Sequence, residues 1–133
     1  MKIAITDSQN GVNVGYIQLT IYKDQAELAG RFGDFLGRIP FKWRYPVGVF
    51  EDLFVHKDKR RRGYGRLGCH MADAALKKVG AHTGILKVGW SDDKNWEKAK
   101  SWKTRFFEDA GWMSLQWTFP EPVLMAKNYE LRP

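Results

Sequence analysis

A basic run meets two glycines in the stretch KDKRRRGYGRLG (57–68). The stretch lies between a predicted strand and a predicted helix, and a helix N-terminus offers unpaired backbone N–H groups and the positive end of the helix macrodipole. Glycine lets the main chain approach an anion closely, so this order of elements predicts a pyrophosphate site. The side chains that add positive charge there are Lys57, Lys59, Arg60, Arg61, Arg62 and Arg66.

Two other interpretations of the basic stretch stay open at this point. A run of lysine and arginine is often only a solvated surface, and it also suits a nucleic-acid backbone. The spacing fits neither the G-x-x-x-x-G-K-[ST] loop nor the three-glycine dinucleotide fingerprint. The basic residues cluster at one strand–helix junction instead of spreading over a face, which favours a small phosphorylated ligand over nucleic acid.

The strand that must position this loop is VGVFEDLFVH (47–56). It is apolar on both faces, which is typical of a central strand. Alternation predicts Val49, Leu53 and Val55 on one face and Phe50 and Phe54 on the other. Glu51 and Asp52 interrupt the apolar pattern, and a purely structural strand has little use for adjacent carboxylates. They are candidate functional residues, expected on opposite faces.

The remaining pattern mixes strands and helices without a repeat or a linker. The helical period predicts helices over about 65–79 and 96–110, with Trp102 in the buried stripe of the second. Gly30 and Gly33 would weaken a helix, so the segment AELAGRF is interpreted as a strand and 34–46 as a loop. Further strands are expected at 2–6, 12–22, 84–90, 114–119 and 122–131.

Composition narrows the function classes. The 133 residues, interpreted as a single domain spanning 1–133, carry 22 lysines and arginines against 15 acidic residues, and the net charge of +7 favours anionic partners. The single cysteine, Cys69, excludes an internal disulfide, and the three histidines show no metal-ligand spacing. No apolar run has the length of a signal peptide or a membrane span, so we expect a cytoplasmic protein.

The segment 51–68 resembles the cofactor-binding segment of the GNAT superfamily of N-acetyltransferases. The signature [QR]-x-x-G-x-[GA] and the apolar strand pattern before it are filled by Arg60, Gly63, Gly65, Leu53 and Val55. RFFEDAGW (105–112) is similar to the FYEKxGF segment that closes the family's second helix. The resemblance implies a compact α/β fold, an α+β mixed sheet of about six to seven strands with two main helices.

The resemblance also implies a site for acetyl-CoA. The backbone of the strand would pair with the pantetheine arm, and the amides of the loop would bind the pyrophosphate. The implied cofactor-binding residues are Phe54, Val55, Arg60, Arg61, Arg62, Gly63, Tyr64, Gly65 and Arg66. Glu51 stands where several members have the base that takes a proton from the acceptor amine, and Asp52 is the competing candidate. Either acid could instead only pair with a neighbouring arginine or lysine.

The second helix departs from the family pattern. Phe107 stands at the position of the tyrosine that often serves as general acid, and Lys100 and Lys103 replace the usual asparagine and alanine. Either the thiolate leaves without that acid, or catalysis is absent, or another group serves, for which the candidates are Tyr64, His56 and Tyr129.

The N-terminal part departs as well. The family usually has two helices between its first two strands, on the acceptor side, and residues 7–13 leave no room for them. The acceptor pocket must then come from the segment 23–46 or from another subunit of a homodimer. The loop GRIPFKWRYP (37–46) is a candidate for that surface, or it is simply pinned by its own aromatic side chains. Trp102 and Trp112 are interpreted as core residues.

The function that these features favour is an acetyl-CoA-dependent N-acetyltransferase that acts on a primary amine, without a metal. The positive charge of the chain favours an acidic protein that carries the amine over a cationic acceptor. The alternative is a catalytically weak or inactive module on the same fold, which binds CoA and docks on a protein or nucleic acid. A basic nucleic-acid binder ranks third.

Overall fold

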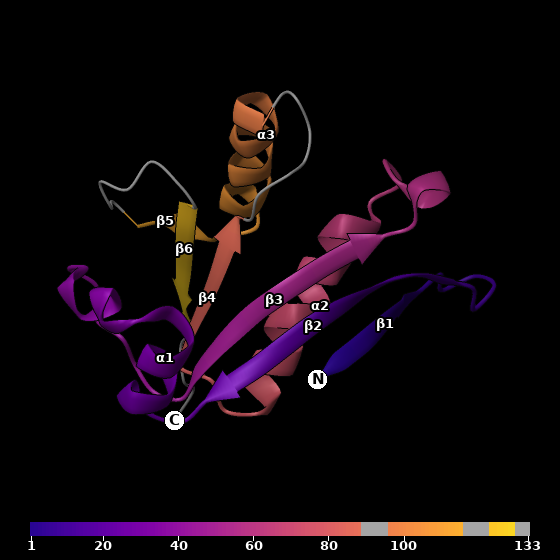
Figure 1. The fold of residues 1–133 in the computed structure, drawn as a ribbon. Coiled ribbons are helices and arrows are strands. Elements are labelled where there is room, and N and C mark those ends of the chain that lie inside the picture. Colours follow the sequence, from indigo (N-terminus) through magenta and orange to yellow (C-terminus); the bar gives the residue numbers. More distant parts are fainter. Residues whose placement is uncertain (89–95, 116–122, 130–133) are drawn as a thin grey trace.

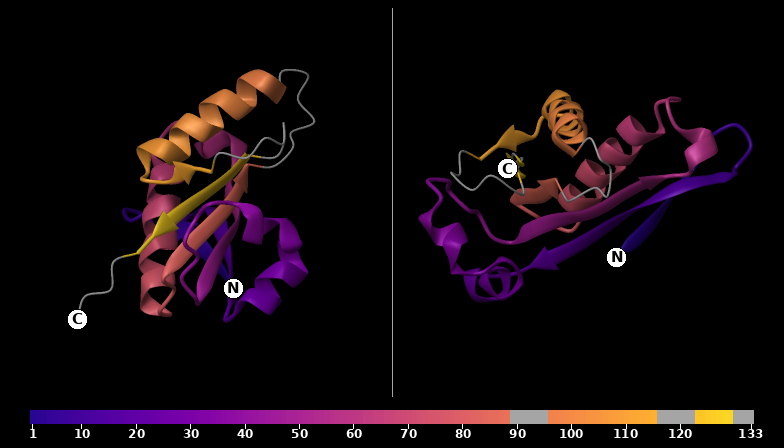
Figure 2. Two further views of the ribbon diagram at one scale, coloured as in Figure 1. Left: turned by 90° about the vertical axis from the view of Figure 1, so that its left-hand side faces the viewer. Right: turned by 45° about the horizontal axis from the view of Figure 1, so that its top comes forward.

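The computed structural model describes residues 1–88, 96–115 and 123–129. There, a mixed six-stranded sheet in the order β1-β2-β3-β4-β6-β5 carries helices on both faces (Figures 1 and 2). The strands are β1 (Lys2–Thr6), β2 (Asn13–Tyr22), β3 (Val47–Val55), β4 (Thr83–Val88), β5 (Met113–Ser114) and β6 (Val123–Asn128). The helices are α1 (Gln25–Phe32), α2 (Tyr64–Lys78) and α3 (Trp96–Asp109), with short 3₁₀ turns η1 (Asp34–Arg38) and η2 (Lys57–Lys59).

The expected mixed sheet is confirmed, and so is the missing helix pair between the first two strands. β1 and β2 pair directly as antiparallel neighbours, and residues 7–12 between them form a turn. No helix in the part of the chain that the structure describes is long and apolar enough to cross a membrane.

The two central strands stay together over only part of their length. β3 and β4 pair in parallel from Val47 with Thr83 to Phe50 with Leu86. Beyond those positions β3 continues against β2, and β4 continues against β6, so the two strands diverge (Figure 1). A sheet that opens in its middle leaves backbone polar groups of both strands without a strand partner, which is a place for a ligand.

A β-bulge marks the point where the strands separate. Gln18 of β2 pairs with Asp52 and Leu19 pairs with Phe50, so Glu51 is an extra residue in β3. A bulge of this kind bends the strand, and the extra residue exchanges the faces on which the residues after it would otherwise lie. The expected alternation is therefore wrong: Phe50 and Leu53 pack on the face of α2, while Val49 packs on the face of α1.

Each face of the sheet has its own core. α2 covers one face with Cys69, Ala72 and Leu76, and the packing there is close, because a Cβ on Gly68 would lie 2.5 Å from the side chain of Leu53. On the other face, α1 contributes Leu28 to a second core with residues of β3, β4 and β6. Figure 2 shows α1 on one side of the sheet and α2 and α3 on the other.

The segment 26–32, interpreted above as a strand, lies in helix α1, so that prediction is wrong. Asp24 caps the helix by accepting from the N–H of Glu27, and the side chain of Glu27 accepts from the N–H of Lys23. This reciprocal capping outweighs the low helix propensity of Gly30, which occupies an exposed position. The predicted loop 34–46 includes the short η1 turn.

Two tryptophan predictions have different outcomes. Trp112 is 2% exposed and belongs to the core beneath α2, as expected. Trp102 is 59% exposed, so its assignment to the buried stripe of α3 is wrong. Phe106 and Ala110 of the same stripe do pack against the core.

Candidate active site

A cleft of about 1250 Å³ opens where β3 and β4 separate. Its walls are the last six residues of β3, the last three of β4, the start of α2 and one side of α3. Glu51, Asp52, Phe54, Val55, Arg60, Arg61, Gly63, Tyr64, Gly65 and Arg66 all line it. The structure therefore brings together ten of the eleven residues that the sequence predicted; the eleventh, Arg62, is exposed and does not line the cleft.

The start of α2 has the backbone form of an anion site. Arg61 and Gly63 both adopt left-handed conformations, with φ of 65° and 84°. Backbone that alternates in this way forms concave nests of N–H groups. The first bond within the helix runs from the N–H of Leu67 to the carbonyl of Gly63, so the N–H groups before Leu67 have no acceptor inside the helix. Gly63 supplies no side-chain cap that would compete with a ligand.

A hydrogen bond fixes this helix start to the turn between β1 and β2. The hydroxyl of Tyr64 donates to the carboxylate of Asp7. The bond lowers the pKa of Asp7, with a smaller contribution from the N–H of Gln9, and the same bond raises the pKa of Tyr64. Tyr64 lines the cleft, but its proton is engaged, which weakens its candidacy as a general acid.

The side chain of Arg60 contacts the end of β3 and not the nest of N–H groups. Its Nε donates to the carbonyl of Val55 at 3.0 Å. That carbonyl faces away from β2, since the N–H of the next residue, His56, donates to Val14 of β2. Arg60 thus occupies one of the strand groups that the resemblance assigns to the pantetheine arm, and it holds the loop against the end of β3.

Both acids lie on the α1 face of the sheet, which corrects their expected placement on opposite faces. The bulge is the reason, because it inserts Glu51 between positions that would otherwise alternate. Asp52 accepts from the hydroxyl of Tyr16 at 3.1 Å and is exposed. The carboxylate of Glu51 is less exposed and lies 3.0 Å from the guanidinium of Arg31 in α1.

Arg31 is a site residue that the sequence did not reveal. It precedes Glu51 by 20 positions, and the interpretation of 26–32 as a strand gave no reason to place it near the cleft. A signal was present in the capping pattern of Asp24 and Glu27, which predicts a helix and would have put Arg31 in its last turn.

The other candidates for a general acid differ sharply in position. Phe107 lines the cleft and packs edge-on against Phe50, with 6.2 Å between ring centroids. Tyr129 is buried away from the cleft, where desolvation raises its pKa and its hydroxyl donates to Asp73. His56 is exposed beside Phe54 at the end of β3, outside the cleft lining.

Three further residues concern the α3 wall of the cleft and the single cysteine. Lys103 lines the cleft, whereas the side chain of Lys100 lies outside the described residues. Burial raises the pKa of the Cys69 thiol to about 12, so this cysteine is neutral and inert at ordinary pH. The described residues hold no cluster of metal-ligand side chains.

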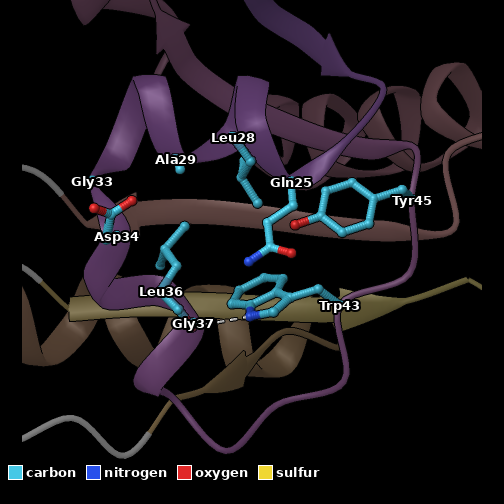
Figure 3. A pocket seen from close by; sticks show the side chains of 9 residues that line it. All are labelled: Gln25, Leu28, Ala29, Gly33, Asp34, Leu36, Gly37, Trp43 and Tyr45. Atoms are coloured by element: carbon cyan, nitrogen blue, oxygen red, sulfur yellow. Dashed lines mark hydrogen bonds between the residues drawn. The ribbon is translucent and has the colours of Figure 1, made fainter.

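The segment 23–46 encloses a second, separate cavity of about 510 Å³ (Figure 3). Figure 3 shows the side chain of Gln25 and the hydroxyl of Tyr45 pointing into it, beside the ring of Trp43. Trp43 donates to the carbonyl of Leu36 and packs 4.8 Å from the ring of Phe41, so aromatic side chains do pin the loop. None of the residues that line this cavity also lines the cleft.

The residues present fit acetyl-CoA at the level of chemistry. The cleft offers a nest of N–H groups with arginines at one end and open strand backbone along its length. The packing around the nest leaves space for an anion at its glycine, because a Cβ on Gly63 would meet no atom within 4 Å. Gly65 instead faces α3, where a Cβ would lie 3.3 Å from Phe106.

Comparison with known families gives one match along most of the chain. The model described as "Acetyltransferase (GNAT) family" matches residues 3–97. Comparison with the sequences of curated proteins gives no significant match.

Several solved structures share the fold. The PaiA N-acetyltransferase of Thermoplasma acidophilum in complex with coenzyme A is 16% identical over 90% of this chain and 56% of its own, with a TM-score of 0.58. PH1933 of Pyrococcus horikoshii OT3 is 20% identical over 94% of this chain and 63% of its own, with a TM-score of 0.58. The NatC complex bound to Gag peptide and CoA matches at 13% identity over 94% of this chain and 69% of that chain, also with a TM-score of 0.58.

These identities establish likeness of fold alone. The chain spans only 56% and 63% of the lengths of the first two structures.

Proposed function

The chain belongs to the GNAT family of acetyltransferases, and we propose that it is an acetyl-CoA-dependent N-acetyltransferase whose acceptor is a primary amine. The observation that carries the proposal is the divergence of β3 and β4 after Phe50 and Leu86. It opens a cleft that has the N–H nest of α2 at one end and two carboxylates on the opposite face of the sheet.

The cleft residues divide into three roles. The nest at Arg61 and Gly63 binds the pyrophosphate, and the cationic side chains around it add Coulomb attraction. The edge of β3 left free by β4 positions the extended arm that leads from the phosphates to the reacting atom. Glu51 accepts the proton that the acceptor ammonium must lose, because only the neutral amine has a lone pair for attack.

Bound acetyl-CoA supplies the acetyl group as a thioester, whose C–S bond breaks as the amine nitrogen bonds to the carbonyl carbon. Phe107 lines the cleft without a hydroxyl, so the sulfur leaves without a proton from that position. Arg31 orients the carboxylate of Glu51 through its 3.0 Å contact, and in this way α1 acts on the acceptor side. The segment 23–46 therefore takes part in the acceptor site through Arg31.

A second candidate function is a binding module that holds CoA and docks on another macromolecule. Two observations favour it. Phe107 occupies the place of the expected acid, and Glu51 is already paired with Arg31, which suits a structural carboxylate as well as a base.

Calorimetric titration with acetyl-CoA, CoA and a short DNA duplex, followed by an assay of CoA thiol release with a panel of amines, tests these functions. We expect both CoA forms to bind, the duplex not to bind, and thiol release to require an amine. Binding of CoA without release for any amine would favour the binding module, and binding of the duplex alone would favour a nucleic-acid protein.

A further inference from the structure

Two charged residues flank the mouth of the cleft, one on each diverging strand. Phe50 and Leu86 are the last paired residues of β3 and β4, and Glu51 and Lys87 are the next residue on each strand. Both line the cleft. They are thus the first side chains met on either side of the opening.

Their side chains lie on the same face of the sheet. Lys87 pairs with Leu124 of β6, and cross-strand partners share a face. Leu124 belongs to the core beneath α1, and the side chain of Glu51 reaches Arg31 of α1. Glu51 and Lys87 therefore face each other across the opening on the α1 side.

Both carboxylates at the mouth have partners among the described residues. Glu51 is paired with Arg31, and Asp52 accepts from the hydroxyl of Tyr16. Lys87 is exposed and has no ionic partner among the residues that the structure describes. An ammonium group held at the mouth of the cleft, opposite a carboxylate, matches an anion on the incoming acceptor.

We propose that Lys87 binds a carboxylate of the acceptor, so that the substrates of this site are amines that carry a carboxylate a few bonds away. The amine then lies against Glu51 and the carboxylate against Lys87, with the two ends of the acceptor spanning the mouth. The inference rests on the proposed acetyltransferase function. A free amino acid and the N-terminus of an acidic peptide both have this chemistry.

The test compares matched acceptors that differ only in charge. The free amino acids alanine and glutamate are compared with alaninamide and glutamine amide. The peptide Asp-Ala-Ala is compared with Asn-Ala-Ala, both with a free N-terminal amine and an amidated C-terminus. Converting the α-carboxylate to an amide makes the amine less basic, so a larger fraction of it is neutral, and without an anion site the amides would be the faster acceptors. We expect kcat/KM for the carboxylates to exceed that for the amides by about tenfold or more, as a charge-assisted contact provides. The two series tell a free amino acid from a peptide.

Variants of Lys87 assign the preference to this residue. Lys87→Gln should bring the carboxylate-to-amide ratio close to one, Lys87→Arg should keep it, and Lys87→Glu should invert it. Lys78→Gln is the matched control, since Lys78 is exposed at the end of α2 and its loss changes the net charge equally. Equal rates for acids and amides in the unchanged protein, or a preference that survives Lys87→Gln, would overturn the inference while leaving the acetyltransferase function standing.

Binding measurements separate this inference from the proposed function. Saturation-transfer NMR with the protein–CoA complex measures the binding of the same pairs of acceptors without turnover. If no amine is acetylated although acetyl-CoA binds, the proposed function fails, and the binding ratio still decides the role of Lys87. If neither acids nor amides bind, the inference fails as well.

Discussion

Arg31 of α1 and Glu51 of β3 form an ion pair of 3.0 Å at the bulge where the central strands separate. The arginine side chain is 41% exposed and the glutamate side chain 19% exposed. The pair joins the helix that follows β2 to the mouth of the cleft, and it fixes the carboxylate on the α1 side of the sheet. A base held in one orientation needs no reorganisation when the amine arrives.

Replacing Glu51 with glutamine tests the proposed base. Glu51→Gln keeps an oxygen for Arg31, so we expect acetyl-CoA affinity to stay and kcat to fall by roughly a hundredfold or more at neutral pH. The loss should shrink at high pH, where the acceptor amine deprotonates without help. Turnover measured over a range of pH, together with acetyl-CoA titration, checks both parts.

Asp52→Asn is the matched control, because Asp52 lines the same cleft but hydrogen-bonds Tyr16 instead of an arginine. A large loss in Asp52→Asn together with unchanged turnover in Glu51→Gln would transfer the role of base to Asp52. Unchanged turnover in both variants would mean that no protein base is needed.

The nest at the start of α2 can be tested with two glycines of similar geometry. Gly63 has φ of 84° and Gly11 has φ of 71°, and a Cβ on either would meet no atom within 4 Å. Valine at either position therefore carries a similar backbone strain, of about 1–2 kcal/mol. Gly11 lies in the turn between β1 and β2 and does not line the cleft.

We expect Gly63→Val and Gly11→Val to lower the melting temperature to a similar degree, since their strain is alike. Only Gly63→Val should lose the stabilisation by acetyl-CoA, because its side chain blocks the approach of the pyrophosphate to the main chain. Thermal unfolding with and without acetyl-CoA measures both effects. An equal acetyl-CoA shift in the two variants would rule out the nest as the phosphate site.

The sequence predicted the order of strand, loop and helix around 57–68 correctly because the signals for these elements are local. The basic run, the glycines and the switch from strand to helix all lie within 57–68, and each has a direct physical reading. The order of strands and helices after Val47 was also correct, since the helices and the longer strands there each have a clear period of their own. Local chemistry and local periodicity are what a single sequence displays most clearly.

The placement of the two acids could not be obtained in the same way. Counting alternate residues along 47–56 assumes an unbroken ladder, and the bulge at Glu51 is visible only in the pairing of β3 with β2. The same bulge ends the pairing with β4 and opens the cleft. One inserted residue therefore decides both the site and the error in predicting its faces.

Helix α1 shows a different limit. Gly30 favoured a strand, but the capping by Asp24 and Glu27 and the burial of Leu28 against the sheet decide the outcome. Intrinsic propensity is a weak signal where tertiary packing is available. The pairing of Arg31 with Glu51 depends on this helix and on the return of the chain in β3, which no local pattern contains.

The bond between Tyr64 and Asp7 predicts a specific dependence of stability on pH. The bond lowers the pKa of Asp7 from its ordinary value of 3.8, so the folded state binds this proton less readily than the unfolded chain. Its stabilisation is therefore complete above pH 3.8 and is lost as the pH falls through the lowered folded-state value. We expect Asp7→Asn to be less stable than the unchanged protein at neutral pH, with the difference vanishing in strong acid.

Urea unfolding between about pH 2 and pH 7 measures this difference. Asp34→Asn is the control, because Asp34 is exposed and accepts no hydrogen bond among the described residues, so its effect should stay small at every pH. A difference between Asp7→Asn and the unchanged protein that stays constant down to the lowest pH would contradict the assignment. Tyr64→Phe should show the larger part of the same pH dependence, since the hydroxyl of Tyr64 is the main cause of the lowered pKa of Asp7.

Replacing Phe107 with tyrosine decides between a slow enzyme and a binding module. The ring of Phe107 lines the cleft and packs against Phe50 and Phe106, so an added hydroxyl stays within the cleft wall. A thiol has a pKa of about 8.5, so its thiolate can leave without full protonation, and loss of the acid should slow the reaction without stopping it. We expect Phe107→Tyr to acetylate amines at least as fast as the unchanged protein, with the largest gain below about pH 8.5.

Phe106→Tyr is the matched control, because its ring also lines the cleft but stands against Gly65 at the start of α2. Release of CoA thiol is followed for all three proteins over one panel of amines, peptides and acidic proteins. If none of them releases thiol although each binds acetyl-CoA, the cleft holds its ligand without turning it over, and the protein acts by docking.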